Sequence, residues 1–350
     1  MKTIIHQYHL NSEVHVGGID TWISDYLEFS TSKVRVLGVS DDREIISHRH
    51  ELFSIMQKKS KVKIPVSLSF SLHVLMHRKL ISQEILVHRL DYVPILRMIR
   101  PRADITLFIH TDSLQQTGSS SDSYWRFIPQ LYFAYEKIAL FLSSRVYVYS
   151  ETDFKRIQSI KASACQLKAW YNDSIFRNLG IPRNSKRILW VGRFEQPKDP
   201  LLAIRSFAEA LEIDSSLNLH LIGDGSLKQA MTHEIVILGL SDRVKIVDPM
   251  NQRELALEMN KGGTLLHTSE FEGSPRILLE ALACGLRLVS NLSADPDKLS
   301  VLFGNCSQSR LPCDVAAALL QVQRRNQAGL ELKEFLSKVA GSTVVGKDFV

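Results

Sequence analysis

Short apolar runs alternate with stretches of helical periodicity through the second half of the chain. Residues 199–211 place every third or fourth apolar side chain on one helical face, after a proline suited to a first helical turn. Further helices are expected near 227–238, 252–260 and 275–285. The apolar runs between them are RILWVG at 187–192, NLHLIGDG at 218–225, RVKIVD at 243–248, GTLLHTS at 263–269 and LRLVSN at 286–291. This alternation predicts a parallel sheet covered on both faces, which would bind ligands at the carboxyl ends of its strands.

The first half follows the same pattern less regularly. A helix should follow the loop at Gly17 and Gly18, and a longer helix should span about 124–142. The turn-rich segment 171–186 lacks periodicity and is predicted to link two domains, at 1–170 and 187–325. Residues 326–350 form a C-terminal segment that we expect to pack back on the first domain. Strands are expected at 3–8, 34–39, 84–88, 104–110 and 145–150.

Composition places the chain among globular proteins with room for two cores. It has 350 residues, of which 45% are hydrophobic and 23% charged, and no apolar run is long enough to span a bilayer. Its first residues make a poor signal peptide, and its four cysteines lack CxxC spacing, so we expect a cytoplasmic protein without a zinc site. The net charge of +6 permits anionic partners such as nucleotides or lipid head groups. Nucleic acid is not expected, because no strip of interleaved basic and aromatic residues occurs.

The stretch FEGSPRILLEALACG at 271–285 contains two carboxylates in an unusual setting. Glu280 interrupts an apolar helix, and Glu272 precedes it in a loop. With Ser274 as N-cap and Pro275 at the first helical position, the helix would turn its free N–H groups toward the strand ends, where they attract anions. Glu280 could then accept hydrogen bonds from a vicinal diol such as a ribose. The alternative is that Glu280 pairs with a nearby arginine and that Glu272 is a solvated loop residue.

Two more strand ends carry matching signals. Arg193 and Lys198 lie on the loop after the run at 187–192 and could close on one diphosphate from two directions. Gly223 and Gly225 follow the next run, where the backbone must turn sharply or pass close to a ligand. Each signal alone is weak, since basic loop residues are usually solvated. Together they fit a nucleotide diphosphate that bears a polyol. A dinucleotide fingerprint fails, because Lys228 stands where its third glycine would be.

These blocks resemble the retaining glycosyltransferases of family four, which have the GT-B fold of two Rossmann-like domains with parallel sheets facing across a donor and acceptor cleft. The resemblance is strong over about 186–290, where the spacing from Glu272 to Glu280 is its most specific mark. In the first half, VGGIDTWISDY resembles the family's glycine loop, and LFIHTD contains its histidine, His110. Asn172-Asp173 departs from the usual Asn-Gly, and Arg287 and the sequence after it depart from the family's Pro and Gly-Gly loop.

The resemblance implies a role for each candidate residue. Arg193 and Lys198 would hold the donor diphosphate, Glu280 the ribose and Glu272 the donor sugar, while His110 would lie near the reacting sugar. Catalytic roles thus fall on Arg193, Lys198, Glu272 and His110. The remaining substrate contacts implied are Gly17, Gly18, Gly192, Gly223, Asp248, Pro249, Gly273, Ser274, Pro275, Arg276 and Glu280.

The expected reaction is transfer of a hexose from a nucleotide-diphosphate sugar to a glycan, lipid-linked or small-molecule acceptor, without a metal or other cofactor. The donor half offers no Asp-x-Asp ligand pair at a strand end, so the two cations would stabilise the leaving diphosphate. An epimerase or hydrolase of the same fold and a non-catalytic binding subunit are the alternatives. The basic, apolar segment Val93–Arg102 would suit peripheral contact with an anionic membrane, although a helix with one core face explains it as well.

Overall fold

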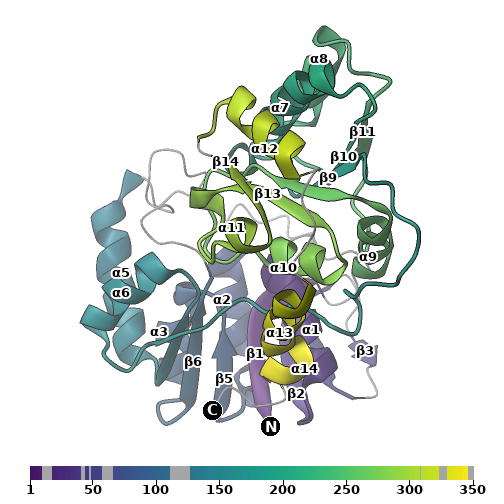
Figure 1. The fold of residues 1–350 in the computed structure, drawn as a ribbon. Coiled ribbons are helices and arrows are strands. Elements are labelled where there is room, and N and C mark those ends of the chain that lie inside the picture. Colours follow the sequence, from purple (N-terminus) through teal and green to yellow (C-terminus); the bar gives the residue numbers. More distant parts are fainter. Residues whose placement is uncertain are drawn as a thin grey trace. The chain divides into compact units, whose positions relative to one another are not determined.

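A computed structural model describes residues 1–9, 18–40, 44–46, 49–56, 66–110, 127–307, 309–322 and 329–345. They form two compact units that divide between Lys168 and Ala169 (Figure 1). Each unit has its own sheet and its own hydrophobic core. The alternation of strands and helices that the sequence predicts is therefore present in both units.

The sheet of the first unit has eight strands in the order β3-β4-β2-β1-β5-β6-β7-β8. Neighbouring strands are parallel except for β3 and β4, which pair antiparallel at the edge. This short antiparallel edge was not predicted. The strands are β1 Lys2–His9, β2 Val34–Val39, β3 Glu44–Ile46, β4 Glu51–Met56, β5 Glu84–Val87, β6 Asp104–Ile109, β7 Arg145–Val148 and β8 Cys165–Gln166.

Helices flank this sheet and close its core (Figure 1). The long helix begins at Pro129, not near residue 124, because proline suits a first helical turn and lacks the N–H that later turns require. Residues 111–126, which include the polar loop before it, lie outside the described residues. The helices are α1 Gly18–Phe29, α2 Val66–Met76, α3 Val93–Ile99, α5 Pro129–Leu142 and α6 Glu151–Ile160, with short 3-10 turns at Arg78–Leu80 and Leu90–Tyr92.

The sheet of the second unit has six strands, all parallel, in the order β11-β10-β9-β12-β13-β14. β9 is the first strand of this unit in sequence and lies between β10 and β12. The loops that follow these three parallel strands therefore meet at one edge of the sheet. The strands are β9 Arg187–Val191, β10 Asn218–Ile222, β11 Val244–Val247, β12 Thr264–His267, β13 Arg287–Asn291 and β14 Gly304–Ser307.

The helices of the second unit begin where the sequence supplies caps. Asp199 caps α7 by accepting the N–H of Leu202, and Asn251 with Glu254 forms a capping box at α9. The helices are α7 Pro200–Ile213, α8 Lys228–Ile237, α9 Gln252–Lys261, α10 Arg276–Ala283, α11 Leu299–Phe303, α12 Pro312–Val322, α13 Gly329–Lys338 and α14 Gly341–Val344, with 3-10 turns η4 Gln196–Lys198 and η5 Leu292–Ala294.

Two glycines after β10 allow the loops of this unit to touch. A Cβ at Gly223 would lie 1.9 Å from the carbonyl oxygen of Gly192, and one at Gly225 would lie 2.6 Å from that of Phe194. The backbone of Phe194 also accepts the N–H of Leu227 and donates to the carbonyl of Asp224. The glycines are thus needed for contact between the loops after β9 and β10.

The segment 171–186 groups with the second unit by its contacts. Tyr171 donates its N–H to Val339 and accepts that of Gly341, and Asp173 accepts both the N–H and the hydroxyl of Ser342. The departure from Asn-Gly at Asp173 therefore supplies a carboxylate that holds α14. Helices α13 and α14 also belong to this unit, with Leu332 and Val339 in its second hydrophobic cluster.

Candidate functional site

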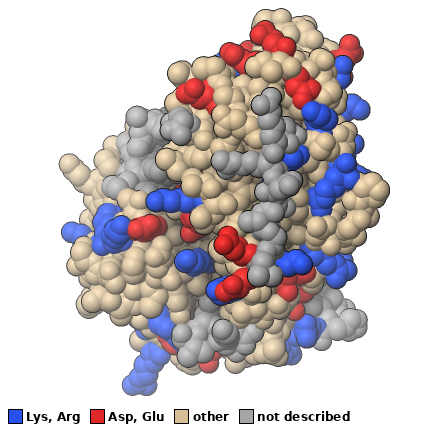
Figure 2. Space-filling view, viewed as in Figure 1, with Lys and Arg blue, Asp and Glu red and all other residues tan. Residues whose placement is uncertain are grey.

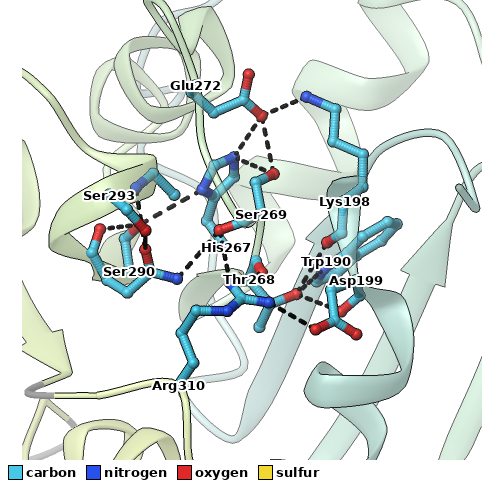
Figure 3. Close-up of polar contacts among 12 residues, drawn as sticks. Trp190, Lys198, Asp199, His267, Thr268, Ser269, Glu272, Ser290, Ser293 and Arg310 are labelled. Carbon is cyan, nitrogen blue, oxygen red and sulfur yellow. Dashed lines mark hydrogen bonds and ion pairs between the residues drawn. The ribbon is translucent and has the colours of Figure 1, made fainter. Parts of the chain in front are cut away.

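Lys198 and Glu272 meet at the carboxyl edge of the second sheet, although 74 residues separate them in the chain. Lys198 ends η4, which follows β9, and Glu272 lies in the loop between β12 and α10. The Lys198 ammonium group donates to Oε1 of Glu272 (Figure 3). The side chains are only 26% and 16% exposed, so the pair is largely removed from water.

Three donors converge on this single carboxylate oxygen (Figure 3). Besides Lys198, the Ser269 hydroxyl donates to Oε1 at 2.8 Å, and Nε2 of His267 lies 3.4 Å from it. Among the residues that the structure describes, the other oxygen, Oε2, has no hydrogen-bond partner. Glu272 is therefore held by one oxygen and presents the second as an acceptor.

The charge state of Glu272 follows from these neighbours. Burial on its own would raise the pKa of the carboxyl, but the charge of Lys198 and the hydrogen bond from His267 outweigh it and lower the pKa to about 2. Glu272 is thus ionised throughout the neutral range. The idea that Glu272 is a solvated loop residue does not describe this environment.

The backbone that carries Lys198 is held in an uncommon conformation. The next residue, Asp199, is left-handed, with φ 44° and ψ 63°, which an Asp tolerates better than most side chains. The Thr268 hydroxyl donates to the Asp199 carbonyl at 2.8 Å and accepts the indole N–H of Trp190, also at 2.8 Å. Trp190 lies on β9 and is almost fully buried. These contacts to a buried core residue therefore fix the position of the backbone from which the Lys198 side chain extends.

Arg310 completes this arrangement, and no pattern in the sequence indicates it. Its guanidinium donates to Asp199 at 2.6 Å and to the carbonyls of Thr268 and Ser269 at 2.7 and 2.8 Å (Figure 3). It thereby ties the η4 turn to the loop after β12. His267 and Ser269 were also missed, since their role depends on the path of that loop.

Arg193 lies near the start of the same loop and differs from Lys198. Its side chain is exposed and has no hydrogen-bond or ion-pair partner in the described part of the chain. Neighbouring Gly192 is the residue whose carbonyl Gly223 approaches. Arg193 is thus a cation that the folded unit does not use for its own packing.

Glu280 is buried on α10, as its sequence setting predicts. Its Oε1 lies 3.8 Å from a guanidinium nitrogen of Arg276, one helical turn earlier, and this guanidinium lies 4.9 Å from the centre of the Trp170 ring. An arginine partner, the alternative considered for Glu280, is therefore present, although 3.8 Å is longer than a hydrogen bond. The implied ribose contact stays a prediction.

The start of α10 differs from the prediction by one residue. Pro275, not Ser274, is the N-cap residue, and it makes no side-chain capping hydrogen bond. The pyrrolidine fixes φ of Pro275 near its usual value, and its ψ of 95° is still extended, so the helix starts at Arg276. Gly273, Ser274 and Pro275 form the segment between Glu272 and the start of α10.

The remaining predicted contacts lie on other parts of the chain. Asp248 follows β11, is 84% exposed at its side chain and pairs with Lys228 at 2.8 Å, with Pro249 next to it. Among the described residues neither belongs to the polar network around Glu272. Gly17 lies outside the described residues, and Gly18 is the first residue of α1. His110 belongs to the first unit and directly follows β6, where its ring stacks on Tyr149 at 4.7 Å.

In the view of Figure 2, Lys and Arg side chains are interspersed with Asp and Glu, and large uncharged areas lie between them. The described residues contain no helix long and apolar enough to cross a membrane, and no cluster of His, Cys, Asp or Glu suited to a metal ion.

Part of the second unit resembles known glycosyltransferases in sequence. Residues 172–294 match the protein-family model described as glycosyl transferases group 1. Over 120 residues the chain is 31% identical to D-inositol 3-phosphate glycosyltransferase of Corynebacterium diphtheriae, a match that covers 33% of this chain and 28% of that protein. The matched part therefore spans less than a third of this curated relative.

Solved structures share the whole fold at low sequence identity. Sucrose-phosphate synthase of Thermosynechococcus elongatus superimposes with a TM-score of 0.79 at 15% identity, over 99% of this chain and 96% of that one. HepE of Anabaena, solved in complex with UDP and glucose, gives 0.73 at 12% identity, over 99% and 97%. The predicted two-domain GT-B fold is confirmed. The resemblance to glycosyltransferases holds at the level of group 1, and family four with its retaining mechanism stays a prediction.

The depressed pKa of Glu272 predicts how this site affects stability. A carboxyl whose pKa falls from 4.5 to about 2 on folding stabilises the fold above pH 4.5 by roughly 3 kcal/mol, because each tenfold change in a proton-binding constant is worth about 1.4 kcal/mol. This stabilisation is lost as the pH falls from 4.5 toward 2. Glu272→Gln should therefore lower the free energy of unfolding by roughly 2–3 kcal/mol at pH 7 and by less at pH 3.5. Urea titrations at both pH values measure the difference.

Glu334→Gln is the matched control, because Glu334 pairs with Lys338 on the surface, where both side chains are about 70% exposed. Its unfolding should change little at either pH. A Glu272→Gln effect that is as small as that of the control, or that does not shrink at low pH, would contradict the ion pair.

Proposed function

We propose that the protein is a glycosyltransferase that moves a sugar from a nucleotide-diphosphate sugar to a glycan, lipid-linked or small-molecule acceptor. One observation carries the proposal: Lys198 and Glu272 are held together at the carboxyl edge of the second sheet, with the exposed cation Arg193 on the same loop as Lys198. The family match over residues 172–294 and the fold shared with HepE, solved with UDP and glucose, support it.

The donor diphosphate is assigned to the two cations. A diphosphate competes with Glu272 for the Lys198 ammonium, since phosphate oxygens and carboxylate oxygens make the same charge-assisted hydrogen bonds. Arg193 adds a second cation, whose guanidinium makes no hydrogen bond or ion pair among the described residues that a diphosphate would have to replace. Pro275 offers no side-chain cap at the start of α10, and the N-terminal end of a helix favours an anion.

The sugar and the ribose are assigned to the two carboxylates. Glu272 presents Oε2, which can accept a hydrogen bond from a hydroxyl of the transferred sugar, while Ser269 and His267 keep Oε1 in place. Glu280 would bind the ribose if the ribose hydroxyls replaced Arg276 at the Glu280 carboxylate, where the contact is long. Gly273, Ser274 and Pro275 would line the path between the two.

The reaction needs charge stabilisation on the leaving group. Negative charge grows on the bridging oxygen as the diphosphate departs, and preorganised cations lower that barrier without a metal. In a retaining mechanism the acceptor attacks on the face that the diphosphate leaves, and a phosphate oxygen takes its proton. Glu272 then supports the transition state without acting as a nucleophile. Transfer of the sugar, rather than release of free sugar, distinguishes this reaction from that of a hydrolase.

The acceptor would enter from the first unit, with Gly17, Gly18 and His110 near the reacting sugar. Closure of the two units would exclude water from the reaction. A lipid-linked acceptor would also call for peripheral membrane contact. In the segment proposed for it, Arg97 and Arg100 already donate to backbone carbonyls such as those of Leu142 and Ile81, so the exposed residues Met98 and Arg102 would have to make that contact.

Arg193→Ala tests the assignment with little risk to the fold. Because the Arg193 guanidinium makes no hydrogen bond or ion pair among the described residues and only adds to the charge near Glu195, the free energy of unfolding should change little. Turnover should fall by at least about 10²-fold, as for loss of one preorganised charge. The thermal stabilisation that a panel of nucleoside diphosphates gives the wild type should also shrink. Lys245→Ala, which removes an exposed lysine on β11, is the control and should change neither. Equal loss in both variants would contradict a specific role.

Metal independence is tested by chelation. With Arg193 and Lys198 on the leaving group, transfer by the wild type should continue at an unchanged rate in excess EDTA. Added Mg²⁺ or Mn²⁺ should not raise the rate after the chelator is removed. Loss of transfer in EDTA with recovery on adding either metal would show that the two cations do not carry this role.

A further inference from the structure

Two histidines touch at the carboxyl edge of the first sheet. His88 directly follows β5 and His110 directly follows β6, and these strands are parallel neighbours with Val87 opposite Leu107. Nδ1 of His88 lies 2.8 Å from Nε2 of His110, which is a hydrogen bond between the two rings. His88 is buried, whereas His110 is half-buried.

Aromatic neighbours fix the ring of His88. It stacks on Phe108 at 5.1 Å with an interplanar angle of 14°, and Trp22 meets it edge-on at 4.7 Å. Trp22 in turn donates its indole N–H to the Tyr149 hydroxyl at 2.6 Å, and Tyr149 is the ring on which His110 stacks. Both imidazoles are therefore oriented by rings that are themselves packed or hydrogen-bonded.

The protonation of His88 follows from its surroundings. Burial, and then the nearby rings of His110 and His6, lower its pKa well below the usual range, so His88 is neutral and carries one proton. Its Nε2 is buried and has no hydrogen-bond partner among the described residues. Orphaned buried N–H donors are rarer than orphaned acceptors, which favours the proton on Nδ1. In that tautomer His88 donates to Nε2 of His110.

We infer that His88 is a positioning residue that holds His110 as the tautomer with its proton on Nδ1, and so makes Nδ1 the hydrogen-bond donor of His110. The inference rests on the proposed function for its catalytic meaning, because only then does His110 face a reacting sugar. The neutral ring would donate to a sugar or acceptor oxygen from a fixed direction. The tautomer itself is a property of the first unit alone.

Two substitutions at one position separate this role from packing. His88→Phe keeps a ring of similar shape and removes the donor, while His88→Asn restores an N–H close to the position of Nδ1. The tautomer of His110 is read from long-range ¹⁵N–¹H spectra of protein labelled at histidine, with the signals assigned by His110→Gln. The same proteins are assayed for kcat and for KM of the donor sugar nucleotide.

The wild type should show His110 protonated on Nδ1. His88→Phe should lose that tautomer and lower kcat on the order of 10²-fold, with KM for the donor little changed, because the donor contacts lie in the second unit. His88→Asn should recover the tautomer and most of kcat. A wild-type His110 protonated on Nε2, or an unchanged tautomer in His88→Phe, would overturn the inference. Absence of transferase activity in the wild type would overturn the proposed function and leave the spectra to decide the tautomer.

Discussion

The ionised carboxylate of Glu272, largely removed from water at the edge of the second sheet, is the constraint on which the rest of the site depends. Removing a carboxylate from water is costly unless charges and hydrogen bonds replace the lost hydration. Lys198, Ser269 and His267 do so at one oxygen. The backbone that follows Lys198 is left-handed at Asp199, and Trp190, Thr268 and Arg310 hold that backbone. A single ion pair thus links the η4 turn, which follows the core strand β9, to the loop after β12.

The two units carry different kinds of side chain at the carboxyl ends of their strands. The second unit collects charges at its strand ends, with Lys198, Glu272 and the exposed Arg193 within two loops. The first unit places aromatic rings there, because His88, His110 and Tyr149 follow three adjacent strands. On the proposed function this division suits the two substrates. A diphosphate needs cations, whereas hydroxyl groups need donors and acceptors of fixed direction.

Most of the fold could be predicted from the sequence, because apolar runs and helical periodicity report directly on burial. The convergence of Lys198 with Glu272 could also be anticipated, since both follow strands of one parallel sheet. Their direct contact could not, because it depends on the path of the two loops and on side-chain directions. Arg310 was missed because it meets Asp199 across 111 residues, and no local pattern reports such a contact. The start of α10 was off by one residue, which is the usual uncertainty where two candidate caps adjoin.

The central claim is that Lys198, held by Glu272, is the cation that receives a donor diphosphate. A crystal structure of the protein with a bound nucleoside diphosphate tests it most directly. The account predicts the Lys198 ammonium and the Arg193 guanidinium at hydrogen-bond distance, about 2.7–3.2 Å, from phosphate oxygens, with Ser269 and His267 still on Glu272. A diphosphate that binds away from β9, or one that leaves Lys198 in contact with Glu272 alone, would contradict it.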